Sequence, residues 1–366
     1  MEASSRIVNV EYALLGQDLE LVHKIHLEIS DGIISHIGKG WDVKGKSYPN
    51  SLLMPGLVNS HVHTFDGIAP ELGWNLTLKE VVGDPHSEKY RALSLRSLPE
   101  LRASTLNFLN RSLELGIFTV IDFKEMDING AKISKEVKEI SPINYVTLGR
   151  LDGEITRDRL EILKELVDGY GVSSVSIGIE KLSLIREVFR DKMTAIHVSE
   201  TLRHNLASDL ETSLSTLKPD MVVHGTHLSE EQMELLAETD TKLVICPRSN
   251  LWFSTGIPNI PMMIRKGVRL LIGTDNAGIT DHDLWKELEV ALLLSRLLDP
   301  GSDFSRDILK SATVNPGKGV YPIEEGNRMT GIIMGPLPRF EVSNNRYMAL
   351  IKEPGKIIRV LGLPKI

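Results

Sequence analysis

The chain has 366 residues, of which 42% are hydrophobic and 25% are charged, and its formal net charge is −7. This composition predicts a folded protein with a large core and excludes a disordered chain. The 42 basic and 49 acidic residues argue against a nucleic-acid polymer as partner, because phosphate binding needs a cationic surface. Cys246 is the only cysteine, so an intrachain disulfide is excluded and a reducing compartment is indicated.

The first ten residues lack the apolar run of a secretion signal. No stretch reaches the roughly eighteen apolar residues that a membrane helix needs. We therefore expect a cytoplasmic protein that has no membrane partner.

Short apolar runs alternate with turn residues in the opening segment, at 7–10, 19–29 and 33–38. Period-two alternation broken at an Asp-Gly pair, as at 31–32, is typical of β-hairpins. The opening segment is predicted to be a small β module.

Eight strand candidates follow, separated by segments of helical length and pattern. They are 52–63, 116–123, 143–150, 172–180, 193–200, 220–228, 242–250 and 268–277. The stretches between them, such as 158–170 and 229–238, have apolar residues at three- and four-residue spacings. Eight such units predict a (β/α)8 barrel, because parallel strands need helical crossovers and the eighth strand closes the sheet. A doubly wound open sheet also alternates, but no Gly-x-Gly-x-x-Gly turn follows an early strand.

The tail, 331–366, loses helical periodicity and regains short apolar runs at 348–351 and 357–361. We expect these runs to pair with the N-terminal module. The predicted fold is therefore α/β, a (β/α)8 TIM barrel with a small flanking β-sandwich domain built from both chain ends. The boundaries are 1–51 for the N-terminal part of the β domain, 52–325 for the barrel and 326–366 for the C-terminal part.

Catalytic groups in such a barrel lie at the C-terminal ends of the strands. Ionisable residues cluster at those ends, namely His61, His63, His197, Glu200, His224, His227 and Asp275. His61 and His63 share one face of a strand and can reach one ion, although alone they are also compatible with two surface histidines. Together with His197 and Asp275 they supply three nitrogens and a carboxylate, which suits zinc or iron(II).

The run Met-Pro-Gly-Leu-Val-Asn-Ser-His-Val-His at 54–63 resembles the signature of the amidohydrolase superfamily. From 223 to 295 the chain resembles the deaminase and chlorohydrolase branch, which includes adenosylhomocysteine, cytosine and guanine deaminases. This likeness lies in His-Gly at 224–225, Cys-Pro-Arg-Ser-Asn at 246–250, Gly-Ile-Pro at 256–258 and Gly-Thr-Asp at 273–275. The resemblance covers most of the chain and implies a hydrolase of carbon–nitrogen bonds other than peptide bonds.

The same resemblance implies one divalent metal, with zinc preferred to iron(II). Matching by position gives its ligands as His61, His63, His197 and Asp275. Glu200, three residues after the strand-five histidine, matches the proton shuttle, and His224 matches the histidine that polarises the attacked carbon or steers the water. Asp275 would also accept a hydrogen bond from the nucleophile.

Elementary chemistry supports these roles, because a metal lowers the pKa of water and a desolvated carboxylate can shuttle a proton. Each catalytic candidate also has a structural alternative. Glu200 could stand at a helix N-terminus, Asp275 could cap a turn, and His224 could be a hydrogen-bonded core histidine.

Six residues near the strand ends are predicted to contact the substrate, namely Ser249, Asn250, Trp74, Glu125, His227 and His282. Ser-Asn is also a common turn pair, a loop tryptophan often only packs, and His227 could cap its loop. The favoured reaction is deamination of an amino-substituted N-heterocycle or nucleoside. A small-molecule substrate is the expected partner, and the resemblance also implies a homo-oligomer.

Two alternatives stay open. Lys181 could match the carboxylated lysine of dihydroorotase- and phosphotriesterase-like members, giving a binuclear hydrolase of cyclic amides or esters. A catalytically inactive metal-binding barrel is the second alternative. The spacing of His197 and Glu200 favours one metal, and a structural metal site needs no nearby acid. The substrate histidine after strand four is absent at 176–181, so the substrate stays open.

Overall fold

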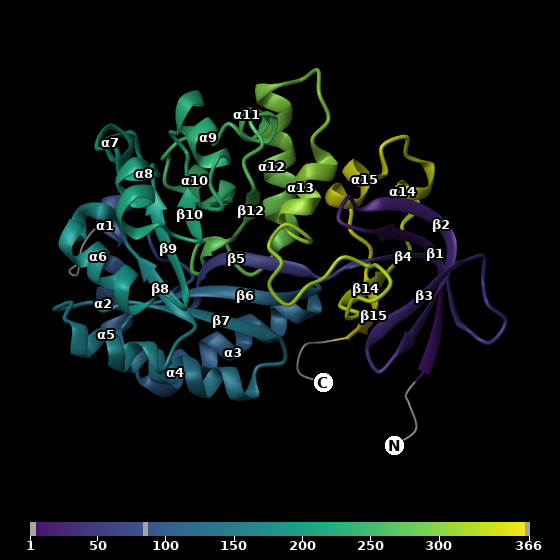
Figure 1. Cartoon of the computed structure of the whole chain (residues 1–366), viewed down its shortest axis with the longest axis horizontal. Coiled ribbons are helices and arrows are strands. Elements are labelled where there is room, and N and C mark those ends of the chain that lie inside the picture. Colours follow the sequence, from purple (N-terminus) through teal and green to yellow (C-terminus); the bar gives the residue numbers. More distant parts are fainter. Residues whose placement is uncertain (1–4, 83–86, 363–366) are drawn as a thin grey trace.

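Two β-sheets organise the computed structural model, which describes residues 5–82 and 87–362 (Figure 1). The smaller sheet has the strand order β15-β14-β4-β1-β2-β3. Its strands are β1 (Ser5–Leu15), β2 (Glu20–Ser30), β3 (Ile33–Lys39), β4 (Lys46–Pro55), β14 (Gly331–Met334) and β15 (Ile357–Leu361). Strands β14 and β4 pair antiparallel, so the two ends of the chain meet in one sheet.

The expected β-sandwich is not confirmed, because the described residues of this region form one six-stranded sheet. The run at 348–351, predicted to be extended, lies in helix α15 (Arg346–Lys352). The Asn345 side chain caps this helix by accepting a hydrogen bond from the backbone of Met348 at 3.0 Å. Leu350 and Ile351 are buried in the main core, so the helix covers the barrel instead of adding a strand.

The larger sheet contains nine parallel strands in the order β12-β11-β10-β9-β8-β7-β6-β5-β13. They are β5 (Leu57–His63), β6 (Ile117–Lys124), β7 (Asn144–Gly149), β8 (Gly169–Val172), β9 (Met193–Val198), β10 (Met221–His224), β11 (Lys242–Ile245), β12 (Leu270–Ile272) and β13 (Asp275–Asn276). Strands β12 and β13 are two parts of the eighth strand. Because β13 pairs with β5, the sheet curls back on itself as a TIM-like barrel.

Helices surround this sheet (Figure 1). Several short helices lie in the connections that follow the C-terminal ends of the strands. The longer ones are α3 (Leu98–Glu114), α4 (Asp127–Ile140), α5 (Arg157–Lys164), α6 (Ile179–Val188), α9 (Glu230–Ala237) and α12 (Leu284–Leu298). The shorter ones are η1 (Thr64–Ile68), α1 (Leu78–Val82), α2 (Glu88–Ser94), η2 (Val175–Ile177), α7 (Leu202–Leu206), α8 (Asp209–Thr212), η3 (Ser213–Leu217), α10 (Pro247–Trp252), α11 (Ile260–Arg265), α13 (Ser305–Ser311) and α14 (Pro338–Val342). None of the described helices is both long enough and apolar enough to span a membrane.

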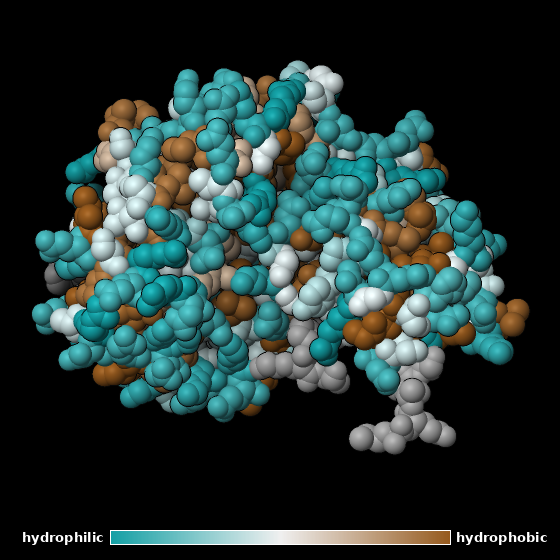
Figure 2. Space-filling model, viewed as in Figure 1, coloured by the Kyte–Doolittle hydropathy of each residue, from teal (hydrophilic) through white to brown (hydrophobic). Residues whose placement is uncertain are grey.

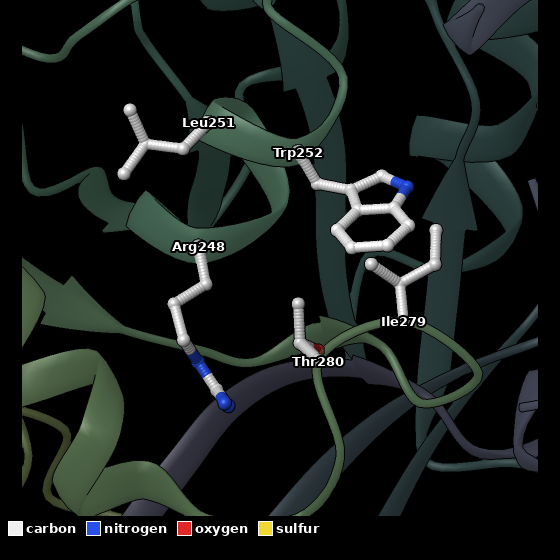
Figure 3. Close-up of a pocket in the computed structure, with 5 residues that line it drawn as sticks. All are labelled: Arg248, Leu251, Trp252, Ile279 and Thr280. Atoms are coloured by element: carbon white, nitrogen blue, oxygen red, sulfur yellow. The ribbon is translucent and has the colours of Figure 1, made fainter. Parts of the chain in front are cut away.

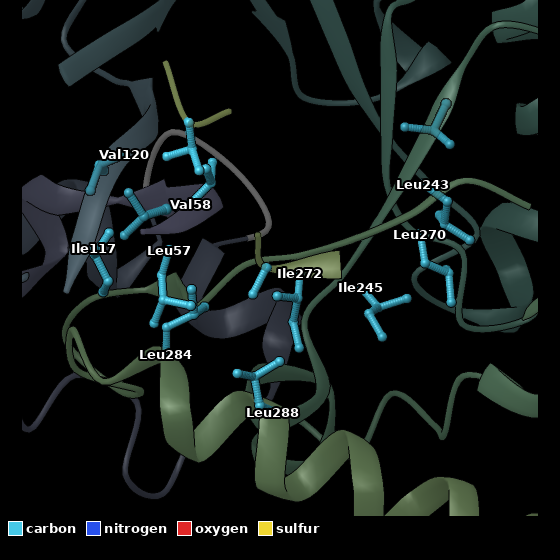
Figure 4. Close-up of a cluster of buried hydrophobic side chains, with 14 of the residues drawn as sticks. Leu57, Val58, Ile117, Val120, Leu243, Ile245, Leu270, Ile272, Leu284 and Leu288 are labelled. Atoms are coloured by element: carbon cyan, nitrogen blue, oxygen red, sulfur yellow. The ribbon is translucent and has the colours of Figure 1, made fainter. Parts of the chain in front are cut away.

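Alternating side chains of the barrel strands build two layers of core. The inner cluster fills the barrel and includes Phe123, Val244, Cys246 and Leu271. The outer cluster lies between strands and helices, and Figure 4 shows Leu243, Ile245, Leu270 and Ile272 of the strands with Leu284 and Leu288 of α12. On the face in Figure 2 hydrophilic residues predominate, as expected when the apolar faces of the elements point inward.

The fourth barrel strand differs from its prediction at 172–180. The strand is β8 (Gly169–Val172), while η2 and the start of α6 occupy the predicted residues. Two of its four residues are glycines, which pattern analysis scores as poor strand formers. They are required here, because a Cβ on Gly169 would lie 2.2 Å from the carbonyl oxygen of Met193, and one on Gly171 would lie 2.6 Å from Phe123.

The contact that closes the barrel lies between the first and eighth strands. Asp275 pairs with Val62 and Asn276 with His63. The Asn59 amide donates to Thr274 Oγ1 at 2.8 Å, and its oxygen accepts from the Thr274 backbone at 3.1 Å. We call this contact the seam.

Gly273 lies in the seam, where an added Cβ would be 2.7 Å from both the backbone N and O of His61. Because these atoms belong to a neighbouring strand, they can yield only if the seam opens. We expect Gly273→Ala to lower the free energy of unfolding by about 1–3 kcal/mol, as overpacking does. Urea denaturation of the metal-free protein measures this. Gly301→Ala is the control, since Asp299 Oδ1, at 3.6 Å, is the only atom of the described residues within 4 Å of its Cβ. An equal loss in both variants would contradict the prediction.

Candidate metal centre

Four histidines and an aspartate converge at the C-terminal edge of the barrel. His61 and His63 lie on β5, His197 on β9, His224 at the end of β10 and Asp275 at the start of β13. Ligand atoms of His61, His63 and His197 lie within 4.8 Å of one another, and so do those of His61, His224 and Asp275. The barrel therefore brings together the four residues predicted from the sequence to be metal ligands, with His224 beside them.

Hydrogen bonds at Nδ1 fix the orientation of three of the rings. The Nδ1 atoms of His63, His197 and His224 lie 2.5 Å from Glu125 Oε1, 3.0 Å from the Val172 carbonyl and 3.1 Å from Asn250 Oδ1, respectively. The Nε2 atoms of His61 and His63 both face Asp275 Oδ1, at 3.1 and 3.5 Å. In His63, His197 and His224, Nε2 is thus the ring nitrogen left for a shared ion, which is the usual arrangement of histidine ligands.

Burial keeps the imidazoles of His61 and His197 neutral, as metal ligands must be. Burial lowers the pKa of His61 to about 4, against the opposing effect of Asp275, and it lowers the pKa of His197 well below its usual range. Burial alone would raise the pKa of Asp275, but the hydrogen bond from His61 and the interactions with the neighbouring imidazoles hold it well below its usual range. The centre therefore offers neutral nitrogens and an ionised carboxylate.

This donor set fits zinc or iron(II), which accept imidazole nitrogen and carboxylate oxygen together. The ring centroid of His61 lies 4.9 Å from that of His63 and 5.0 Å from that of His197. His61 Nδ1 is buried without a hydrogen-bond partner among the described residues. Such crowding of desolvated polar rings is costly unless an ion compensates it.

Glu200 lies two residues after β9 and is almost buried, with 13% of its side chain exposed. Its Oε1 is 3.7 Å from His224 Nε2. Burial raises the pKa of Glu200, which brings it towards the range in which a carboxylate both accepts and donates protons. The N-cap of the following helix α7 is Thr201, so Glu200 also lies next to a helix N-terminus, the structural alternative considered for it.

The backbone is unusual where two of the catalytic candidates are held. His224 has a φ of 74° and Asp275 a φ of 62°, both in the left-handed region that non-glycine residues rarely adopt. Each costs about 1–3 kcal/mol in general, and such conformations concentrate at functional sites.

Ser249 and Asn250, which are predicted to contact the substrate, contact residues of the metal centre. Both are buried on α10, where Ser249 Oγ donates to Asp275 Oδ2 at 2.5 Å and Asn250 Oδ1 contacts His224 Nδ1. Their polar atoms are used to hold Asp275 and His224. Ser249 and Asn250 therefore lie next to the metal centre and support two of its residues, Asp275 and His224.

Glu125, also predicted to contact the substrate, has its described contacts with His63 and with basic side chains. It is fully buried, and its Oε1 contacts both His63 Nδ1 and Lys89 Nζ, the latter at 2.7 Å. Lys89 on α2 also contacts Asp66 Oδ2 at 2.9 Å. Sequence reasoning missed Lys89 and Asp66, because no local pattern marks an ion pair between distant segments.

The remaining predicted residues lie apart from these contacts. The Trp74 side chain is 72% exposed in the loop before α1, and His227 Nε2 is 2.5 Å from the Thr255 carbonyl, in the loop-capping role. His282 is half-buried with its ring 6.1 Å from that of Phe108. Lys181 is exposed on α6, so the structure contradicts its placement at the end of strand four.

A cavity of about 370 Å³ lies between α10 and the loop after β13 (Figure 3). It is lined by Arg248, Leu251, Trp252, Ile279 and Thr280. The Arg248 guanidinium is held by Glu287 and Asp281, with the shortest contact 2.7 Å from Nε to Glu287 Oε1. The wall is therefore mostly apolar, with one indole ring.

Comparison with known proteins gives matches over most of the chain. Residues 52–319 match the model of the amidohydrolase family. A protein named putative aminohydrolase from Methanothermobacter thermautotrophicus is 32% identical over 82% of this chain and 84% of its own length. A 5-methylthioadenosine/S-adenosylhomocysteine deaminase from Thermococcus sibiricus is 25% identical over 86% of this chain and 81% of its own. The structure of an adenosine deaminase from Xanthomonas campestris with bound zinc shares the fold, with a TM-score of 0.82, 18% identity and coverage of 98% and 92%.

Proposed function

Because this chain belongs to the amidohydrolase family and is a hydrolase of carbon–nitrogen bonds, we propose that it deaminates an amino-substituted N-heterocycle or nucleoside. The observation that carries this proposal is a buried carboxylic acid, Glu200, next to a cluster of histidines and an aspartate whose ligand atoms lie close together. Relatives named as deaminases support the choice of an amine as leaving group. The substrate is proposed as a class and not as one compound.

His61, His63, His197 and Asp275 would hold one divalent ion, with zinc preferred and iron(II) second. When bound, such an ion supplies a water whose pKa is lowered towards neutrality. Lys181 is exposed on α6, so it offers no bridging ligand for the binuclear alternative.

The chain's own residues then move the proton. Ionised Glu200 accepts a proton from the attacking water and, once protonated, donates it to the departing amine. Asp275 accepts a hydrogen bond from the attacking water while Ser249 holds its other oxygen. His224, oriented by Asn250, faces Glu200 and the reacting carbon. Asp275 and His224 thus act at positions that a second residue fixes.

Ammonia release by the zinc-reconstituted protein tests this function on purines, nucleosides, pyrimidines, pterins and triazines. We expect at least one amino-substituted ring to release ammonia and to gain a carbonyl group, as seen by mass spectrometry. A zinc-loaded, folded protein that releases nothing from the whole panel would favour the inactive barrel. Release of a halide or a cleaved ring, without ammonia, would overturn the amine as leaving group.

The pH profile should show the raised pKa of Glu200, whose ordinary value is 4.5. The base must be ionised, so activity is lost as the pH falls through its pKa. Because burial raises that pKa, we expect the acid limb of kcat/KM to have its midpoint above 4.5 with a slope of one. Circular dichroism at each pH checks that the fold persists, and a limb at or below 4.5 would contradict the assignment.

A further inference from the structure

A buried row of charged groups connects the loop after β5 to His63. Lys89 Nζ lies 2.9 Å from Asp66 Oδ2 and 2.7 Å from Glu125 Oε1, and the same Oε1 lies 2.5 Å from His63 Nδ1. The side chains of Lys89, Asp66 and Glu125 are at most 4% exposed. An isolated charge at this depth would be very costly, so these groups depend on one another.

The three residues come from three different elements. Asp66 lies in η1, directly after strand β5, which carries His61 and His63. Lys89 lies on α2, and Glu125 follows β6. Lys89 therefore joins α2 to Glu125 at the end of β6, and Glu125 is the carboxylate that contacts His63. Arg150 adds a second cation at longer range, with Nη2 4.0 Å from Glu125 Oε1.

We infer that Glu125 and Lys89 are positioning residues for the proposed metal ligand His63. A carboxylate at Nδ1 holds that nitrogen protonated, directs the Nε2 lone pair towards the centre and raises the basicity of the ring. Lys89 supplies the positive charge that keeps this carboxylate stable without water. The inference rests on the proposed metal site and adds two residues that would set its affinity.

The geometry separates this role from a merely structural ion pair. The Arg248–Glu287 pair is equally buried at its carboxylate, with Glu287 Oε1 2.7 Å from Arg248 Nε, yet none of the described contacts of Glu287 is to a histidine. Glu125 instead joins its cation directly to a proposed ligand. Glu287→Gln is therefore the matched control, with the same substitution at the same depth.

The experiment measures zinc affinity by competition with a chromophoric chelator, together with the visible spectrum of the cobalt(II)-substituted protein. We expect Glu125→Gln to weaken zinc binding about 10–100-fold, as loss of a ligand's partner does, and to shift the cobalt bands. Glu287→Gln should leave both readings unchanged while lowering the thermal midpoint of the metal-free protein by a similar amount. Wild-type affinity and spectrum in Glu125→Gln would overturn the inference.

The triple variant Asp66→Asn/Lys89→Met/Glu125→Gln covers the case in which the single variant does not fold. It removes the buried cation and both of its carboxylates, so none of the three is left as an unpaired buried charge, and a structural role alone predicts that zinc affinity returns to the wild-type value. We expect the loss of at least tenfold to persist, because the carboxylate at Nδ1 is still absent. Failure of the wild-type protein to bind zinc would instead overturn the proposed function, so the two failures are distinguishable.

Discussion

Glu200→Gln is expected to lower kcat for ammonia release by about 10²- to 10⁴-fold, the usual contribution of a general acid–base group. Glutamine has nearly the same shape and can still lie beside His224, whose Nε2 is 3.7 Å from Glu200 Oε1, but it cannot accept a proton from water or return one to the amine. KM should change little, because the lost interaction belongs to the transition state. Steady-state kinetics on the substrate found in the panel measures both values.

A measurement of zinc affinity shows whether the lower kcat of Glu200→Gln comes from the missing acid–base group or from weaker zinc binding. Glu200 is not among the proposed ligands, so Glu200→Gln should bind zinc as the wild-type protein does. Glu180→Gln changes an exposed glutamate at the start of α6 and should keep full activity. If Glu200→Gln also kept full activity, the shuttle assignment would be wrong.

Asp275→Asn is expected to weaken zinc binding at least 100-fold and to abolish activity at limiting zinc. Loss of a ligand's supporting partner typically costs 10–100-fold, so loss of the only anionic ligand should cost at least the upper end of that range. The amide keeps the shape of the side chain and an oxygen that can still accept from Ser249. The charge is therefore the main property removed. Chelator competition and metal content after dialysis measure the effect.

Asp281→Asn serves as the control for this substitution. Asp281 is six residues further on and pairs with Arg248 and Lys286 outside the histidine cluster. It should retain wild-type zinc content. Equal zinc content in the Asp275→Asn protein would show that the ion is not held as proposed.

The resemblance to the amidohydrolase superfamily is confirmed by the family match, and the barrel could be predicted because most of its strands are apolar and β-branched. The predicted bounds of strand β8 were wrong because its glycines are required by close contacts with Met193 and Phe123. These two residues lie far from β8 in the sequence. The tail was misread at Leu350 and Ile351, since a short apolar run fits a strand and a buried helix face equally well.

The sequence allowed us to predict which residues lie close to one another at the site, but not which of them contact the substrate. His61 and His63 share a strand face, so their convergence follows from local geometry. Whether a polar residue faces the substrate or supports another residue depends on side-chain partners that no sequence pattern encodes. Ser249, Asn250 and Glu125 were expected in the pocket for that reason, and the structure uses each of them to hold a neighbour.

The seam pairs only two residues of β13 with β5, and the proposed ligands come from both sides of it. An ion shared by His61, His63 and Asp275 would join the first and last strands as a crosslink. Closure of the barrel and metal binding would then be one linked equilibrium. At a zinc concentration 100 times Kd, the linkage is worth about 2.7 kcal/mol. We then expect the seam to open about a hundredfold less often when zinc is bound. Hydrogen exchange at the backbone amide of Asn276 measures this opening.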